Sequence, residues 1–141
     1  VASKIITNGK ILAIDKQPME SIEKVIFFQC DILSEEAKKK ILSTFSSKLD
    51  VIVSDMAENT TGIKSTDSIR TNSLCLEVME ISFKFLTNNG SLVSKLFMGK
   101  DFLAVKDLAK SKFKKVEFFK PESSRSESKE TYIYCSLLKT L

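Results

Sequence analysis

Residues 24–55 read KVIFFQCDILSEEAKKKILSTFSSKLDVIVSD, and they predict a strand, a helix and a second strand. The apolar runs at 24–29 and 50–54 have the length and the aromatic or β-branched content of buried strands. Between them, Ser34 precedes two glutamates and can cap a helix that extends to about Phe45. Two strands joined by a helix usually lie parallel, because the crossover returns the chain to the end of the sheet from which it started.

The alternation of strands and helices continues on both sides of this stretch. Apolar runs and helical spacing predict further strands at 10–15, 91–97, 113–119 and 130–138, and helices at 66–86 and 101–112. Thr66 or Asp67 is the expected cap of the longer helix, and Asn88-Asn89-Gly90 is its expected end. No helix separates the last two strands, so we expect an antiparallel hairpin there. The prediction is an α/β domain with a mostly parallel sheet, helices on both faces and a terminal hairpin.

The composition excludes several classes of protein. The chain has 141 residues, 43% of them hydrophobic and 28% charged, which is ordinary for one globular domain and unlike a disordered chain. It contains no histidine, which excludes Ser-His-Asp catalysis and histidine metal sites. Three widely spaced cysteines without a CxxC pair favour reduced thiols over a zinc site. With no histidine and no CxxC pair we expect no metal, and because no apolar run approaches ~18 residues we expect no membrane as a partner.

The positive charge is concentrated in one segment. The net charge is +4, and residues 106–120 hold six lysines against two acids, an excess equal to that of the whole chain. Such a surface can bind the phosphate backbone of a nucleic acid. It can equally be a solvated surface without a partner, and the sequence leaves both interpretations open.

Charged residues follow or interrupt the predicted strands. Asp15, Asp31 and Asp55 stand at the ends of three strands, and ligands of parallel sheets bind at that edge. A carboxylate there can accept two ribose hydroxyls, although aspartate is also a common turn residue. Lys95 lies within an otherwise apolar strand, where a buried ammonium requires a partner. It either reaches water at the strand end or belongs to an active site near Asp55.

Longer motifs give the chain a family resemblance. They are AIDKQPM at 13–19, FFQCDI at 27–32, VIVSDMAENTTG at 51–62, DSIRTN at 67–72, NGSLVSKLFMG at 89–99 and FKKVEFFKPESSRSESKETYI at 113–133. On these motifs the chain resembles, over essentially all of its length, the FtsJ/RrmJ family of S-adenosylmethionine-dependent RNA 2′-O-ribose methyltransferases. The resemblance implies a Rossmann-like methyltransferase fold, an S-adenosylmethionine cofactor and an RNA partner.

The resemblance also implies roles for individual residues. The family uses a Lys-Asp-Lys-Glu tetrad, and its last three members correspond to Asp55, Lys95 and Glu130. A ribose 2′-oxygen would attack the sulfonium methyl in line, with Lys95 acting as base or stabilising the developing alkoxide. Asp15 would bind the cofactor ribose, Asp31 would bind the adenine amino group, and Asp55 would lie near the methionine part. The residues expected to face the substrate are Asn59, Arg125 and Tyr132.

The chain departs from the family pattern in three places. Glu58 stands where the family usually has proline, and Lys129 stands where it usually has arginine. The amino-terminal part of the family pattern has no counterpart here: the first tetrad lysine, the first strand and the glycine-rich loop after it. In the family fold that strand would lie between the strands at 10–14 and 51–54. We therefore expect residues 1–141 to be a single methyltransferase domain truncated at its amino end, which alone neither binds the cofactor well nor turns over.

Substrate and setting remain open between alternatives. Large-subunit ribosomal RNA is the expected substrate, and transfer RNA or the messenger-RNA cap are alternatives within the same superfamily. A non-catalytic RNA-binding or ribosome-assembly module on the same fold is a further alternative. We expect a monomer, located in a bacterial cytoplasm or in a mitochondrion or other organelle.

Overall fold

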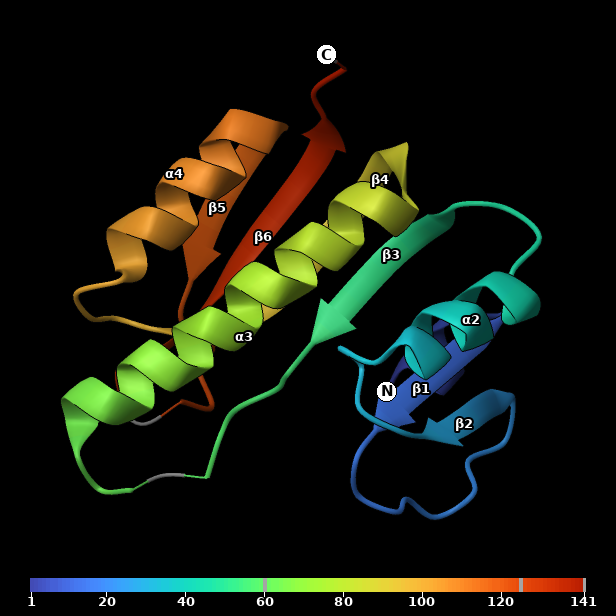
Figure 1. Ribbon diagram of the computed structural model, residues 1–141, viewed down its shortest axis with the longest axis horizontal. Helices are drawn as coiled ribbons and strands as arrows, with labels where there is room; N and C mark the ends of the chain where they lie inside the picture. The colour runs from blue at the N-terminus through green and yellow to red at the C-terminus, as the bar shows by residue number, and fades with distance from the viewer. Residues whose placement is uncertain (60, 125, 141) are drawn as a thin grey trace. The chain divides into compact units, whose positions relative to one another are not determined.

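The computed structural model describes residues 1–59, 61–124 and 126–140, and its chain forms two compact units (Figure 1). The first unit is Val1–Ser47 and the second is Lys48–Leu141. No helix in the part of the chain that the structure describes is both long and apolar enough to cross a membrane.

The first unit contains two parallel strands and two helices. Its elements are α1 (Ala2–Ile5), β1 (Ile11–Asp15), β2 (Val25–Gln29) and α2 (Glu35–Thr44). The pairing of β1 with β2 runs from Ile11 opposite Val25 to Asp15 opposite Gln29, so both strands end at the same edge. The predicted cap of α2 is confirmed, since the Ala37 backbone N–H donates to Ser34 Oγ over 3.1 Å.

The second unit contains a four-stranded sheet. Its elements are β3 (Leu49–Ser54), α3 (Lys64–Phe85), β4 (Leu86–Phe97), α4 (Phe102–Lys112), β5 (Phe113–Phe119) and β6 (Glu130–Leu138). The strand order is β3-β4-β6-β5, with β3 parallel to β4 and β6 antiparallel to both of its neighbours. The predicted hairpin of the last two strands is confirmed. In the sheet β6 lies between β4 and β5, and β5 forms the edge.

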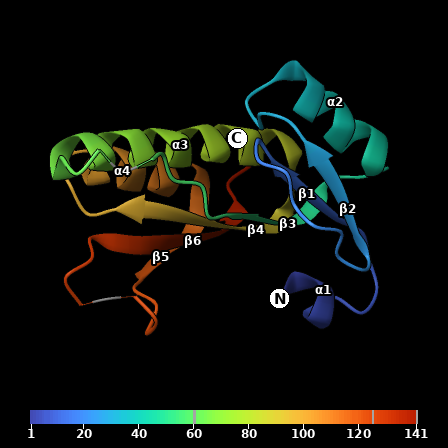
Figure 2. The same ribbon diagram turned by 90° about the horizontal axis from the view of Figure 1, so that it is seen from below.

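Both helices of the second unit cover the same face of this sheet (Figure 2). Alternate residues of β4 and β6, among them Leu92, Leu96 and Ile133, point into the core beneath the helices and are fully buried. The residues between them point to the opposite side, which we call the open face. Val51 and Val53 are 58% and 70% exposed on β3. In the described residues of this unit, both helices therefore lie on one face of the sheet.

Two expectations about α3 are wrong. Asp67 does not cap the helix, which begins at Lys64; its Oδ1 instead accepts hydrogen bonds from the backbone N–H and the hydroxyl of Thr61 at 2.7 and 2.8 Å. Residues 88–90 do not end the helix but lie within β4. The β3–β4 register shifts there, since Leu49 pairs with Leu86 while Val51 pairs with Ser91, and the extra residues form an irregularity in β4.

Candidate active site

The structure brings Asp55, Lys95 and Glu130 together on the open face of the second unit. The Lys95 ammonium lies 3.0 Å from Asp55 Oδ1 and 3.6 Å from Glu130 Oε2. The sheet explains this contact. The last β3 residue pairs with the residue before Lys95, so Asp55 follows the strand end beside it. On the other side of β4, the antiparallel register places β6 residues of the same face next to Lys95.

The three side chains differ in burial, and this difference sets their electrostatics. The Lys95 side chain is 14% exposed, against 29% for Glu130 and 68% for Asp55. An ammonium at this depth requires charged partners, and the two carboxylates supply them. Partial burial raises the pKa of Asp55, but the hydrogen bonds from Tyr132 and Lys95 outweigh it and hold that pKa below its usual value. Asp55 is therefore an ionised acceptor near neutral pH.

Tyr132 is the fourth member of this cluster. Its hydroxyl donates to Asp55 Oδ1 over 2.5 Å, and this is the same oxygen that Lys95 contacts. Burial, the hydrogen bond to Asp55 and the negative charges of Asp55 and Glu130 all raise the pKa of Tyr132. The phenol therefore keeps its proton and acts as a donor. The family resemblance placed Tyr132 on the RNA side; the structure adds that it orients Asp55.

Asn72 is a supporting residue that the sequence interpretation missed. It is fully buried on α3; its Nδ2 donates to the Phe97 carbonyl over 2.9 Å, and its Oδ1 accepts from the Phe97 N–H over 2.8 Å. Because β3 ends at Ser54, it offers no ladder partner to Phe97. Asn72 takes that place and fixes the end of β4 two residues beyond Lys95. The available signal was a polar residue on the buried stripe of α3, which runs from Ser68 through Cys75 and beyond.

Two acids of the first unit lie at the carboxyl ends of its neighbouring strands. Asp15 is exposed, and its Oδ1 accepts the Gln17 N–H over 2.8 Å. Asp31 accepts the Leu33 N–H over 2.9 Å and pairs with Lys16 over 3.1 Å, and these two contacts lower its pKa. Accessible carboxylates are the acceptors that ribose hydroxyls and an adenine amino group require. Their chemistry therefore fits the nucleoside end of S-adenosylmethionine.

The remaining predicted site residues are less informative. Asn59 lies exposed in the loop between β3 and α3. Arg125 lies outside the described residues. Within the described ranges, no group of three or more acidic or cysteine side chains is arranged to hold a metal ion.

The family assignment follows from comparison with known proteins. The sequence model of FtsJ-like methyltransferases matches residues 1–137. The chain belongs to the FtsJ-like methyltransferase family. The expected resemblance is thereby confirmed, and the site described above lies within the matched range.

Relatives from bacteria are similar over nearly the whole chain. "Ribosomal RNA large subunit methyltransferase E" of Pelagibacter ubique is 45% identical over 137 residues, which are 97% of this chain and 68% of that protein. The protein of the same name from Rickettsia felis is 41% identical over 139 residues, covering 94% of this chain and 61% of the relative. The chain thus spans about two thirds of the length of these relatives.

Solved structures agree with the fold class. A protein described as a ribosomal RNA methyltransferase from Plasmodium falciparum superposes with a TM-score of 0.81 at 26% identity, covering 92% of this chain and 72% of that one. Human methyltransferase-like protein 13, solved in complex with SAH, gives a TM-score of 0.60 at 16% identity, covering 96% and 64%. The α/β methyltransferase fold, mostly parallel with an antiparallel hairpin, is confirmed.

Proposed function

We propose that the protein containing this chain transfers the methyl group of S-adenosylmethionine to a ribose 2′-hydroxyl of large-subunit ribosomal RNA. The observation that carries the proposal is the Lys95 ammonium held between Asp55 and Glu130 at the edge where parallel strands end. The family match and the names of the bacterial relatives support the reaction class and the substrate.

The cluster suits the demands of methyl transfer to a hydroxyl. The cofactor, when bound, supplies a methyl group activated by its positive sulfonium. The 2′-oxygen becomes a stronger nucleophile as its proton is lost to solvent water, so negative charge develops on it. An ammonium within hydrogen-bond distance stabilises that charge, and Lys95 is held in a fixed position by two carboxylates and a partly buried site. Lys95 therefore orients the hydroxyl and stabilises the alkoxide, while Asp55 and Glu130 orient Lys95.

The cofactor would be held by carboxylates at strand ends. In this proposal Asp15 accepts hydrogen bonds from the ribose hydroxyls of S-adenosylmethionine, and Asp31 accepts one from its adenine amino group. Asp55 lies near its methionine part. Asp31 is already oriented by Leu33 and Lys16, so little ordering is needed on binding. Both units would belong to one methyltransferase domain, since one family model spans residues 1–137.

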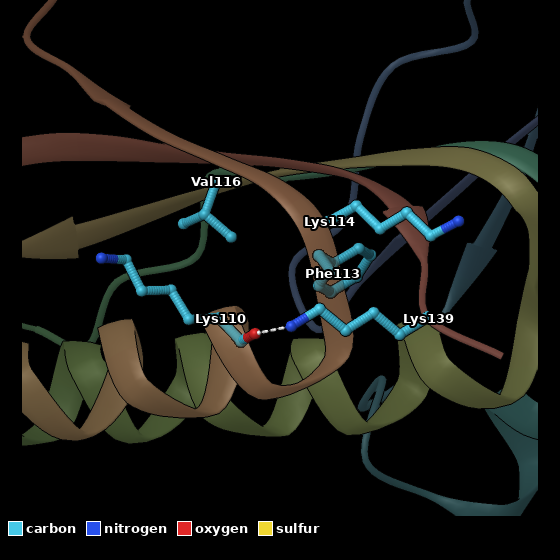
Figure 3. A pocket seen from close by; sticks show the side chains of 5 residues that line it. All are labelled: Lys110, Phe113, Lys114, Val116 and Lys139. Atoms are coloured by element: carbon cyan, nitrogen blue, oxygen red, sulfur yellow. Dashed lines mark hydrogen bonds between the residues drawn. The ribbon is translucent and has the colours of Figure 1, made fainter. Parts of the chain in front are cut away.

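A lysine-rich surface supports RNA as the substrate class. Lys110, Lys114 and Lys139 surround an open hollow of about 300 Å³ whose apolar lining comes from Phe113 and Val116 (Figure 3). Lys139 donates to the Lys110 carbonyl over 2.5 Å. In residues 1–59, 61–124 and 126–140, no ion pair joins these three amines to a carboxylate. Such an unbalanced positive surface attracts a phosphate backbone.

The cellular location of the reaction is the last part of the proposal. The two sequence relatives described above are bacterial proteins, and with large-subunit ribosomal RNA as the substrate we infer that the reaction occurs in the bacterial cytoplasm. A monomeric state stays a prediction.

Methyl transfer by the complete gene product tests the proposal. Purified protein, radiolabelled S-adenosylmethionine and large ribosomal subunits from cells lacking the gene should yield an alkali-resistant dinucleotide, which marks a 2′-O-methyl ribose. Lys95→Ala should lower kcat at least 100-fold while the Kd values for cofactor and RNA stay within about twofold, because the lost interaction belongs to the transition state. Lys100→Ala, an exposed lysine, is the matched control.

Two results would contradict the proposal. A Lys95→Ala enzyme that transfers methyl at the wild-type rate would remove Lys95 from the mechanism. A wild-type protein that binds ribosomal subunits but transfers nothing would favour the alternative of a non-catalytic assembly module.

A further inference from the structure

An aromatic ring with no assigned role lies beside the catalytic cluster. Phe119 is the last residue of β5, at the edge of the sheet, and it is 45% exposed. Its ring stacks on the ring of Tyr132, with centroids 5.6 Å apart and planes 19° from parallel. Tyr132 in turn donates to Asp55, which contacts Lys95. One continuous series of contacts therefore leads from an exposed aromatic surface to the reacting centre.

The strand register fixes how far apart these groups are. Phe119 pairs with Tyr132 across β5 and β6, and Tyr132 pairs with Lys95 across β6 and β4. The three residues form one row on the open face, and neighbouring strands are ~4.8 Å apart, so the Phe119 and Lys95 backbones are separated by roughly 10 Å. That separation suits neighbouring nucleotides of a single strand, one presenting its ribose to Lys95 and the next presenting its base to Phe119.

The ring stack is also held in place before any ligand binds. The hydroxyl of Tyr132 is engaged by Asp55, which fixes the direction of the side chain, and Phe119 packs against its ring. A flat, exposed and fixed aromatic surface is what unpaired nucleobases use for stacking, and it imposes little requirement on base identity. Lys120, the next residue along the chain, is exposed and adds positive charge at the same strand end.

We propose that Phe119 is a nucleobase-stacking residue, which holds the base of the nucleotide flanking the methylated ribose. This inference rests on the proposed function, because it requires an RNA substrate. Phe119 is a positioning residue here: it touches a neighbouring base and thereby sets where the 2′-oxygen meets Lys95. The alternative is a purely structural role, in which Phe119 and Tyr132 form a cross-strand aromatic pair that only stabilises the end of the hairpin.

Three variants of the complete protein separate these alternatives. Phe119→Leu keeps an apolar side chain but cannot stack, Phe119→Trp keeps a stacking ring, and Leu103→Ala alters an exposed apolar residue on α4 as control. The probe is single-stranded oligoribonucleotide containing 2-aminopurine, whose emission falls when the base stacks. We expect Phe119→Leu to weaken binding about tenfold, to abolish the emission change and to raise KM more than it lowers kcat, while Phe119→Trp and the control behave as wild type.

Salt dependence and thermal stability complete the test. Loss of a stack should weaken binding by the same factor at 50 mM and at 200 mM salt, because stacking does not release counterions. Equal RNA affinity and emission in wild type and Phe119→Leu would overturn the proposal. The proposal would also be overturned if Phe119→Leu and Phe119→Trp both lost RNA affinity in proportion to a fall in thermal midpoint. That result would mean that Phe119 only stabilises the packing of the hairpin. If wild type shows Phe119-dependent stacking but transfers no methyl, the proposed reaction fails and the stacking site stands.

Discussion

Replacement of Asn72 by leucine should destabilise the second unit through the end of β4. The side chain is 0% exposed and makes two hydrogen bonds to the Phe97 backbone, at 2.9 and 2.8 Å. Leucine has a similar volume and leaves the Phe97 N–H and C=O without those partners. A hydrogen bond of this kind contributes about 1 kcal/mol net, and a buried group without a partner costs about 1–3 kcal/mol. Because Phe97 is only half-buried, we take the lower value for each group and expect a total of about 2 kcal/mol.

Urea denaturation followed by circular dichroism measures this loss. The midpoint should fall while the slope stays unchanged, since the surface exposed on unfolding is the same. Asn89→Leu, at an exposed position of β4, is the matched control and should change the free energy of unfolding by less than about 0.5 kcal/mol. An Asn72→Leu protein as stable as wild type would show that water or a shifted strand satisfies Phe97. In that case Asn72 would not determine the position of Lys95.

Two further predictions concern stability and titration. Gly99→Ala should lower the free energy of unfolding by about 1–3 kcal/mol, because the added Cβ would lie 2.1 Å from the buried Ser68 Oγ. In the same denaturation assay, the double variant Gly99→Ala/Ser68→Ala should recover part of that loss. If it recovers nothing, the strain does not come from the contact with Ser68. The chain has two tyrosines, and absorbance at 295 nm should show two separate ionisations. Hydrogen bonds from Ser136 and Ser91 lower the pKa of Tyr134 below the ordinary tyrosine value of 10.0, whereas the pKa of Tyr132 lies above it. Because the pKa of Tyr132 is raised in the folded protein, its contribution to stability is present below pH 10.0 and is lost only as the pH rises through the pKa of the folded state. Asp55→Asn should move the ionisation of Tyr132 to lower pH. A single merged ionisation of both tyrosines would contradict the Tyr132–Asp55 contact.

Local signals in the sequence predicted most of the strands and helices. The strands at 10–15, 24–29 and 50–54 have unbroken apolar runs, and Ser34 marks the start of α2 without tertiary information. The start of β4 was misplaced because Asn88-Asn89-Gly90 is a strong local turn signal. In the structure, pairing with β3 and a register irregularity incorporate these residues into the strand. Tertiary pairing therefore overrode a local preference.

The candidate site was less accessible to local reasoning. The apolar strand around Lys95 indicated that its charge required a partner, and Asp55 was an obvious candidate at a strand end. Glu130 was found through the family resemblance, because its approach to Lys95 depends on the antiparallel register of β4 and β6. Asn72 could not be found from either source, since its role depends on where β3 stops relative to β4. The contact network of a site thus requires the sheet topology.

One oxygen atom of Asp55 accepts from both Lys95 and Tyr132. The two donors come from different strands, so this single atom couples β3, β4 and β6 at their shared corner. Energies assigned to the two donors separately will not sum to the energy of the pair, because removal of either one leaves the carboxylate able to turn fully toward the other. The three side chains behave as an indivisible thermodynamic unit.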